Sequence, residues 1–112
     1  MILFLRYSGV GVPLGLLLLL LFLERPQAKA YEDYIELSWP PYQSTAGVAT
    51  SLNLKRQHNN QPPYVLIATL PLTQTVYDDY TTTKHQSYCY VLTAVGPNGE
   101  SAPSDAFCTK MP

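Results

Sequence analysis

This sequence contains few of the residues that usually carry chemistry. Its 112 residues include two cysteines, two histidines and one tryptophan, and only 13% of them are charged. A metal ion needs several ligands held close together. The two histidines, His58 and His85, are not spaced as His-x-x-x-His, and the two cysteines are not spaced as Cys-x-x-Cys. The sequence therefore predicts no metal site and no other cofactor.

Catalytic patterns are missing as well. No Gly-x-Ser-x-Gly sequence, which presents the nucleophile in many hydrolases, is found in the chain. Asp78 and Asp79 are adjacent, so in an extended strand they point to opposite faces and do not form a carboxylate pair. A reactive cysteine needs a nearby base and a lowered pKa, and the pattern supplies neither. We therefore expect that the protein is not an enzyme.

Basic residues are also scarce and are not clustered. Residues 31–112 carry four Lys or Arg side chains and seven Asp or Glu side chains, a net charge of −3. Nucleic-acid binding depends largely on Lys and Arg side chains that neutralise phosphates. We expect no nucleic-acid partner, and the chain offers no polybasic patch for anionic lipids.

The amino-terminal stretch has the layout of a secretory signal peptide. Arg6 precedes an apolar run from Val10 to Leu23, and a small-x-small site follows at Ala28-Lys29-Ala30. We predict a signal peptide helix in residues 1–30 that is cleaved after Ala30. Residues 31–112 then form one domain, since a chain of 82 residues has room for only one.

The alternative is a leader that is never cleaved and holds the protein in the membrane. Tyr7 to Leu23 is a stretch of 17 residues without a charge, at the short end of what crosses a bilayer. Pro13 and the well-placed alanines favour cleavage. With cleavage, we expect the protein to be secreted or held in the cell envelope.

Hydrophobic alternation after the leader predicts strands with one buried face. Ile35, Leu37 and Trp39 alternate with polar residues, and Leu52 and Leu54 do the same. Turn-forming residues separate these segments, and no amphipathic helix of useful length is visible. The spacing predicts an all-β sandwich. Its further β-rich segments are Tyr64–Thr69, Thr75–Tyr77, Tyr88–Val95 and Phe107–Met111.

The order of these segments resembles a fibronectin type III domain, in particular the version common in secreted bacterial proteins. The matching segments are IELSW, SLNLKR, PYVLIATL, TVYDDY and SYCYVLTAVGPNGESAPS. The resemblance implies an immunoglobulin-like sandwich of two sheets, in which Trp39 fills the centre and the Tyr88 hydroxyl bonds back to the preceding turn. The structural core it implies consists of Leu37, Trp39, Leu54, Tyr88 and Leu92.

On this fold, Cys89 and Cys108 lie on neighbouring strands and both point outward. If they oppose each other, the centre of the last hairpin falls between Asn98 and Gly99, with Val95 opposite Ala102. A disulfide in an oxidising compartment is the expected result. Closing its loop would stabilise the fold by about 3 kcal/mol. An exposed unpaired thiol is the alternative.

The chain also departs from the fibronectin pattern. Cleavage after Ala30 leaves only Tyr31-Glu32-Asp33 before Tyr34, so the first strand is expected to be missing or vestigial. Its absence would expose the edge of the Trp39 strand to a partner or a second copy, with Glu32, Asp33 and Glu36 along it. In addition, His85 stands where the family often has glycine, and we expect it to adopt a positive φ.

These observations predict a secreted, non-catalytic module for binding or spacing, at the cell surface or outside the cell. Its partner would be a protein or a polysaccharide. Aromatic side chains that the core does not use could stack on sugar rings, and the candidates are Tyr31, Tyr42, Tyr77 and Tyr80. Two alternatives stay open: a structural subunit that assembles through its open strand edge, and a membrane-anchored module with an uncleaved leader.

Overall fold

The computed structural model describes residues 25–43 and 48–112, and every regular element among them is a β-strand. Within those ranges no helix could span a membrane. Of the leader predicted for residues 1–30, residues 1–24 lie outside the described residues. The strands are β1 (Gln27–Ala30), β2 (Ile35–Ser38), β3 (Ser51–His58), β4 (Gln61–Pro71), β5 (Val76–Asp79), β6 (Ser87–Gly96), β7 (Gly99–Glu100) and β8 (Phe107–Lys110).

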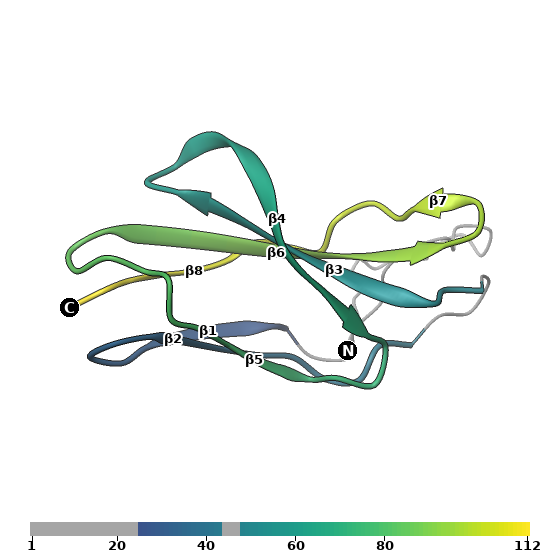
Figure 1. Ribbon diagram of the computed structural model, residues 1–112, viewed down its shortest axis with the longest axis horizontal. Helices are drawn as coiled ribbons and strands as arrows, with labels where there is room; N and C mark the ends of the chain where they lie inside the picture. Colours follow the sequence, from purple (N-terminus) through teal and green to yellow (C-terminus); the bar gives the residue numbers. More distant parts are fainter. Residues whose placement is uncertain (1–24, 44–47) are drawn as a thin grey trace, which may run out of the picture.

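The strands form two sheets that lie as separate layers, one above the other (Figure 1). One sheet has the order β1-β2-β5, and the other has the order β4-β3-β6-β7, with β8 also paired to β6. All strand pairs are antiparallel. The predicted all-β, immunoglobulin-like sandwich is therefore confirmed, and each of the predicted strand segments is found as a strand.

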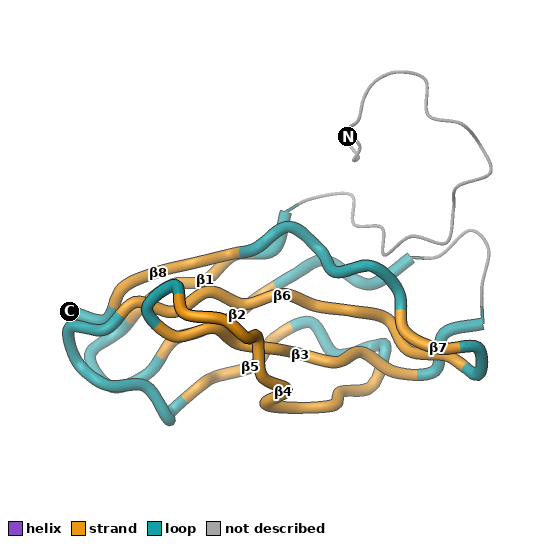
Figure 2. The backbone as a smooth tube through the Cα atoms, turned by 90° about the horizontal axis from the view of Figure 1, so that it is seen from above, coloured by secondary structure: helices purple, strands orange, loops and turns teal. Residues whose placement is uncertain are grey.

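The expectation of a missing or vestigial first strand is wrong for the full chain. Gln27–Ala30 forms β1, which pairs along its whole length with β2. Ala28 and Ala30 pack against the core, and β1 also contacts β8 of the other sheet (Figure 2). Cleavage after Ala30 stays a prediction, and a cut at that bond would remove β1.

With β1 in place, β2 is the central strand of its sheet. Glu36 lies opposite Lys29 of β1 on one side and opposite Asp78 of β5 on the other. The edge that was predicted to be open is thus covered, and Glu36 does not protect an edge. Glu32 lies in the turn after β1, where its carboxylate is 3.1 Å from the Lys84 ammonium nitrogen.

The core lies between the two sheets and consists of the inward-facing residues of both. Trp39 is 4% exposed, and its indole N–H donates a 2.8 Å hydrogen bond to the Gln74 carbonyl oxygen. Leu37, Leu54 and Leu92 are fully buried. A large ring at the centre therefore keeps its polar atom satisfied, as burial of tryptophan requires.

The last hairpin differs from the predicted register beyond its cysteines. Gly96 opposes Gly99 and Val95 opposes Glu100, so the turn is centred between Pro97 and Asn98 and not one residue later. Val95 consequently does not face Ala102. Between β7 and β8 the chain leaves the regular ladder, because Pro103 has no N–H to donate.

Two serine side chains replace the ladder bonds that are missing between β7 and β8. The Ser101 hydroxyl oxygen accepts a 2.9 Å hydrogen bond from the Ala94 N–H, and the Ser104 hydroxyl oxygen accepts a 3.0 Å bond from the Leu92 N–H. The backbone N–H groups of Ser101 and Ser104 complete the exchange with the carbonyls of Ala94 and Leu92. The buried backbone of β6 thus remains hydrogen-bonded throughout this stretch.

Candidate functional site

The two cysteines lie on the outer face of the larger sheet. Cys89 of β6 opposes Cys108 of β8, and their sulfurs form a disulfide. Because residues alternate along a strand, the neighbours Tyr88, Tyr90 and Phe107 point the other way, into the core. The predicted bridge is therefore present, and no described cysteine is free.

The turn before β6 is organised around Tyr88, which is 3% exposed. Its hydroxyl oxygen accepts a 2.8 Å hydrogen bond from the Thr83 N–H in the preceding turn. The His58 ring stacks on the Tyr88 ring at 5.0 Å between centroids, and the His58 Nε2 atom lies 2.9 Å from the Gln86 side-chain oxygen. His85, in the same turn, has a φ of 67°, as the sequence predicted.

A charged cluster between the sheets was not predicted from the sequence. Asp79 of β5 is 3% exposed, and its Oδ2 atom accepts hydrogen bonds from Tyr90 at 2.8 Å and Arg56 at 2.9 Å. The other carboxylate oxygen accepts bonds from the Thr81 N–H and hydroxyl. Burial by itself raises the pKa of Asp79, but these bonds outweigh it and leave the pKa below its ordinary value.

Asp79 also keeps the Tyr90 hydroxyl protonated. Burial and the bond to Asp79 raise the pKa of Tyr90 above its ordinary value, so the hydroxyl remains a donor. The cluster is structural, because its polar atoms are satisfied by one another and it joins the two sheets. One feature of the sequence does indicate this cluster. Arg56 lies on the same face of its strand as Leu52 and Leu54, so its side chain points inward.

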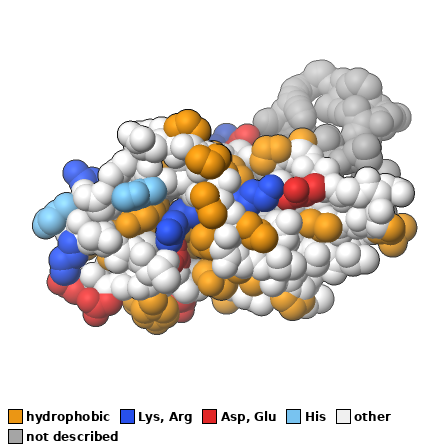
Figure 3. Space-filling model, turned by 45° about the horizontal axis from the view of Figure 1, so that its top comes forward, with side chains coloured by type: hydrophobic (Ala, Val, Ile, Leu, Met, Phe, Trp, Pro, Cys, Tyr) orange, Lys and Arg blue, Asp and Glu red, His pale blue; other side chains and the backbone are white. Residues whose placement is uncertain are grey.

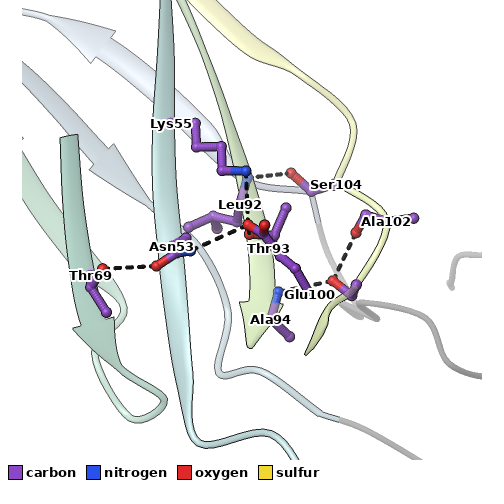
Figure 4. A network of polar contacts seen from close by, with 10 residues as sticks. Asn53, Lys55, Thr69, Leu92, Thr93, Ala94, Glu100, Ala102 and Ser104 are labelled. Carbon is purple, nitrogen blue, oxygen red and sulfur yellow. Dashed lines mark hydrogen bonds and ion pairs between the residues drawn. The ribbon is translucent and has the colours of Figure 1, made fainter. Parts of the chain in front are cut away.

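The outer face of the larger sheet carries a row of polar side chains that crosses four strands (Figure 4). Thr69 of β4 donates a 2.8 Å hydrogen bond to Asn53 of β3, which donates a 3.3 Å bond to the Glu100 carboxylate of β7. The Thr93 hydroxyl of β6 and the Lys55 ammonium also bind this carboxylate. Bonds from Lys55 first, and then from Thr93 and Asn53, lower the pKa of Glu100 to about 2.

The polar groups of this row bond to one another, and its two charged groups, Lys55 and Glu100, are paired with each other. In the space-filling view of this side, apolar side chains lie around the charged groups, and one Lys or Arg side chain lies directly beside an Asp or Glu side chain (Figure 3). Within residues 25–43 and 48–112, no three His, Cys, Asp or Glu side chains are grouped closely enough to hold a metal ion. The exposed aromatic side chains are the remaining candidates for a binding surface.

Of the tyrosines proposed as ligand contacts, the structure leaves one strongly exposed. Tyr42 and Tyr77 are half-buried and pack against the core. Tyr80, directly after β5, is 64% exposed. The first two therefore have a packing role, and Tyr80 becomes the candidate contact residue.

Tyr80 is the outer member of a stack of three aromatic rings. The Tyr34 ring lies on Tyr80 at 4.8 Å between centroids and 26° between planes, and on Tyr31 at 5.0 Å and 14°. The Lys29 ammonium nitrogen lies 5.1 Å from the Tyr31 ring centroid. Tyr31 and Tyr34 are half-buried, so Tyr80 is the most exposed ring of the stack.

The sheet register builds this stack. Ile35 of β2 opposes Asp79 of β5, so the residues one step beyond them, Tyr34 and Tyr80, lie side by side. A backbone bond of 2.8 Å from the Tyr31 N–H to the Tyr34 carbonyl closes the turn and brings the third ring onto the stack. Loss of water around its hydroxyl and, to a lesser extent, the negative charge of Asp78 raise the pKa of Tyr34.

Comparison with known proteins gives likeness in structure only. No protein-family model and no curated protein sequence matches the chain. A solved Fn3-like protein from Clostridium thermocellum superposes with a TM-score of 0.61 at 29% identity, covering 78% of this chain and 88% of that one. The chain has a fibronectin type III-like fold.

Other solved structures contain the same fold as part of larger chains. A β-1,2-glucanase from Parabacteroides distasonis matches with a TM-score of 0.64 at 22% identity, over 78% of this chain and 12% of that chain. Titin domains A168–A170 match with a TM-score of 0.64 at 18% identity, over 80% of this chain and 32% of that one. At these identities the likeness extends to the fibronectin type III-like fold and no further.

Proposed function

We propose that this protein is a secreted, non-catalytic module that binds a neutral polysaccharide through the exposed face of Tyr80. The observation that carries the proposal is the stack of Tyr31, Tyr34 and Tyr80, which ends in a ring that is 64% exposed. Pyranose rings bind to flat aromatic faces, which bury apolar C–H groups while the sugar hydroxyls stay in water.

The stack makes Tyr80 a better platform than an isolated surface tyrosine. Its inner face lies on Tyr34, and this contact limits the side-chain motion that a ligand would otherwise have to arrest. Glu32 and Lys84 form an ion pair in the two neighbouring turns, and charged groups of this kind can accept and donate hydrogen bonds to sugar hydroxyls. Tyr80 is therefore a preorganised contact, and the turns on either side of the stack supply charged groups.

The charge of the chain supports a neutral ligand, and the fold comparisons support a polysaccharide. Residues 31–112 carry a net charge of −3, which disfavours a polyanionic polysaccharide. The same fold occurs within a β-1,2-glucanase and within the pectate lyases Pel3 and PelI, the latter solved with tetragalacturonic acid. The disulfide supports secretion, since such bonds persist in oxidising compartments.

Affinity electrophoresis in gels that contain a neutral β-glucan tests the proposal, with polygalacturonate gels for comparison. We expect the glucan to retard the wild-type protein and Tyr80→Ala to weaken the binding about tenfold, the loss of one aromatic stacking contact. Tyr80→Phe should retain most of the binding, because it keeps the ring face. Val76→Ala, at another exposed apolar position, on β5, is the matched control.

The intrinsic fluorescence of buried Trp39 reports whether each variant is folded. Retardation that is unchanged in Tyr80→Ala would show that the sugar binds elsewhere. A lack of retardation in every neutral glucan would refute the polysaccharide proposal and leave a protein partner or a spacing role as the function to test.

A further inference from the structure

Strand β4 has a hydrogen-bonding partner on one side only. It stands first in the order of its sheet and pairs with β3, and no other described strand pairs with it. We refer to Tyr64–Thr69 as the β4 edge segment. The backbone N–H and C=O groups of this segment that point away from β3 have no partner strand. A row of such groups is a template onto which another strand can add.

The β4 edge segment lacks the charges and prolines that usually protect a sheet edge. It does contain one bulge: Leu54 opposes Ala68 and Lys55 opposes Leu66, so Ile67 between them has no partner on β3. Strands β1, β5 and β8 are each four residues long and carry Lys29, Asp78 and Lys110, respectively. Strand β4 has 11 residues and no charged side chain, and no Asp, Glu, Lys or Arg is found from Gln57 to Tyr77. Its prolines, which would block pairing, lie outside the edge segment at positions 62, 63 and 71.

Apolar side chains are exposed on both faces of the edge segment. Val65 is 56% exposed and Leu66 is 51% exposed. Leu66 is paired with Lys55 and lies on the outer face of the sheet, whereas Val65 is paired with Arg56 and lies on the inner side. A strand added to this edge would cover an apolar side chain on each face, as well as the free backbone groups.

We infer that the β4 edge segment pairs antiparallel with the same segment of a second copy of this chain. An uncharged segment meets itself without like-charge repulsion, and antiparallel pairing about a two-fold axis brings both Val65–Leu66 pairs to its centre. Such an interface is closed, because each copy uses its one long uncharged edge and leaves none for a third. The two larger sheets then form one continuous sheet.

The other described strand edges are poorer pairing partners for the β4 edge segment. Pairing β4 with β1, β5 or β8 would oppose a longer apolar segment to four residues that include a Lys or Asp. The buried charge would lose water without a partner of opposite sign. Head-to-tail pairing of that kind would also leave a free β4 edge on the last copy and form open chains.

Sedimentation velocity over a range of concentrations tests the inference on protein expressed from the full sequence. We expect the wild-type protein to form a concentration-dependent dimer. The double substitution Val65→Lys and Leu66→Lys should raise the dimer dissociation constant at least about tenfold, because it places like charges opposite one another at the two-fold axis. Val76→Lys is the matched control, since Val76 is 54% exposed on the other sheet.

Amide hydrogen exchange locates the contact. In the dimer, N–H groups within Tyr64–Thr69 should become protected as the concentration rises, while those of β5 should not change. A monomer at every concentration overturns the inference, as does a dimer that Val76→Lys weakens as much as the double variant. A dimer without added protection in the β4 edge segment also overturns it, because the copies would then meet through another surface.

Discussion

The Tyr90 hydroxyl donates a 2.8 Å hydrogen bond to the Oδ2 atom of Asp79, and this bond joins β6 of the larger sheet to β5 of the smaller one. The same oxygen accepts a bond from Arg56 of β3, so one buried carboxylate holds two strands of the opposite sheet. Burying such a cluster costs little free energy while every member is paired. Removing one member destabilises the fold, because its partners stay buried without a hydrogen bond.

Asp79→Ala should therefore destabilise the fold strongly. The substitution leaves the guanidinium of Arg56 and the hydroxyl of Tyr90 without their acceptor, and we expect the free energy of unfolding to fall by about 3 kcal/mol. Urea denaturation followed by Trp39 fluorescence measures this change. Asp78→Ala is the matched control, because Asp78 is the neighbouring residue and is exposed. Equal losses in the two variants would contradict the role given to Asp79.

The Glu100 carboxylate should make stability depend on pH in the acid range. Its folded-state pKa is about 2 against an ordinary value of 4.5, so the unfolded state binds the proton more readily. The stabilisation is fully present above about pH 4.5 and is lost as the pH falls toward about 2. The stability difference between wild type and Glu100→Gln should shrink across this window. A difference that stays constant from pH 7 to the acid limit of about 2 would argue against the pairing with Lys55 and Thr93.

The disulfide should contribute stability through the loop that it closes. Cys89 and Cys108 are 19 residues apart in the sequence, and the chain-entropy estimate for such a loop is about 3 kcal/mol. The double variant Cys89→Ala and Cys108→Ala should lose about this much in urea denaturation. Wild-type protein under a reducing agent is the control and should lose a similar amount. No change under either condition would show that the strand pairing of β6 and β8 is sufficient without the bridge.

Removal of β1 should open the edge of β2 and weaken the domain. A chain that starts at Tyr31 loses the ladder with Ile35–Ser38 and the packing of Ala28 and Ala30. We expect its free energy of unfolding to be about 2 kcal/mol lower than that of a chain that starts at Arg25. Amide exchange should be faster at Ile35–Ser38 in the shorter chain. Equal stability and unchanged exchange would mean that β1 adds nothing to the domain.

Much of the fold could be predicted from the sequence because its strands have one buried face. The alternation around Leu37, Leu54 and Leu92 predicts both the strands and which side chains enter the core. The same alternation places Cys89 and Cys108 on the outward face of their strands. Their pairing also needs the irregular stretch between β7 and β8, because the register of the hairpin turn alone would set Cys89 opposite Ala106. Trp39 and His85 were likewise predictable from short-range patterns.

The remaining features depend on contacts between segments that are far apart in the sequence. The stack of Tyr34 and Tyr80 requires the register between β2 and β5, and the Asp79 cluster requires the packing of one sheet on the other. Strand β1 was missed for a different reason. Ala28 and Ala30 fit a peptidase site because they are small, and small apolar side chains also suit the inward positions of a short strand.

The overlap of β1 with the predicted cleavage site makes the outcome a matter of timing. Four residues, Tyr31 to Tyr34, separate β1 from β2, so this pair is the first that can form as the chain emerges. Hairpins close in about 1–10 μs, and strand pairing hides the bond after Ala30 from a protease that binds extended chain. If the predicted cut after Ala30 takes place, it therefore has to precede the pairing of β1 with β2.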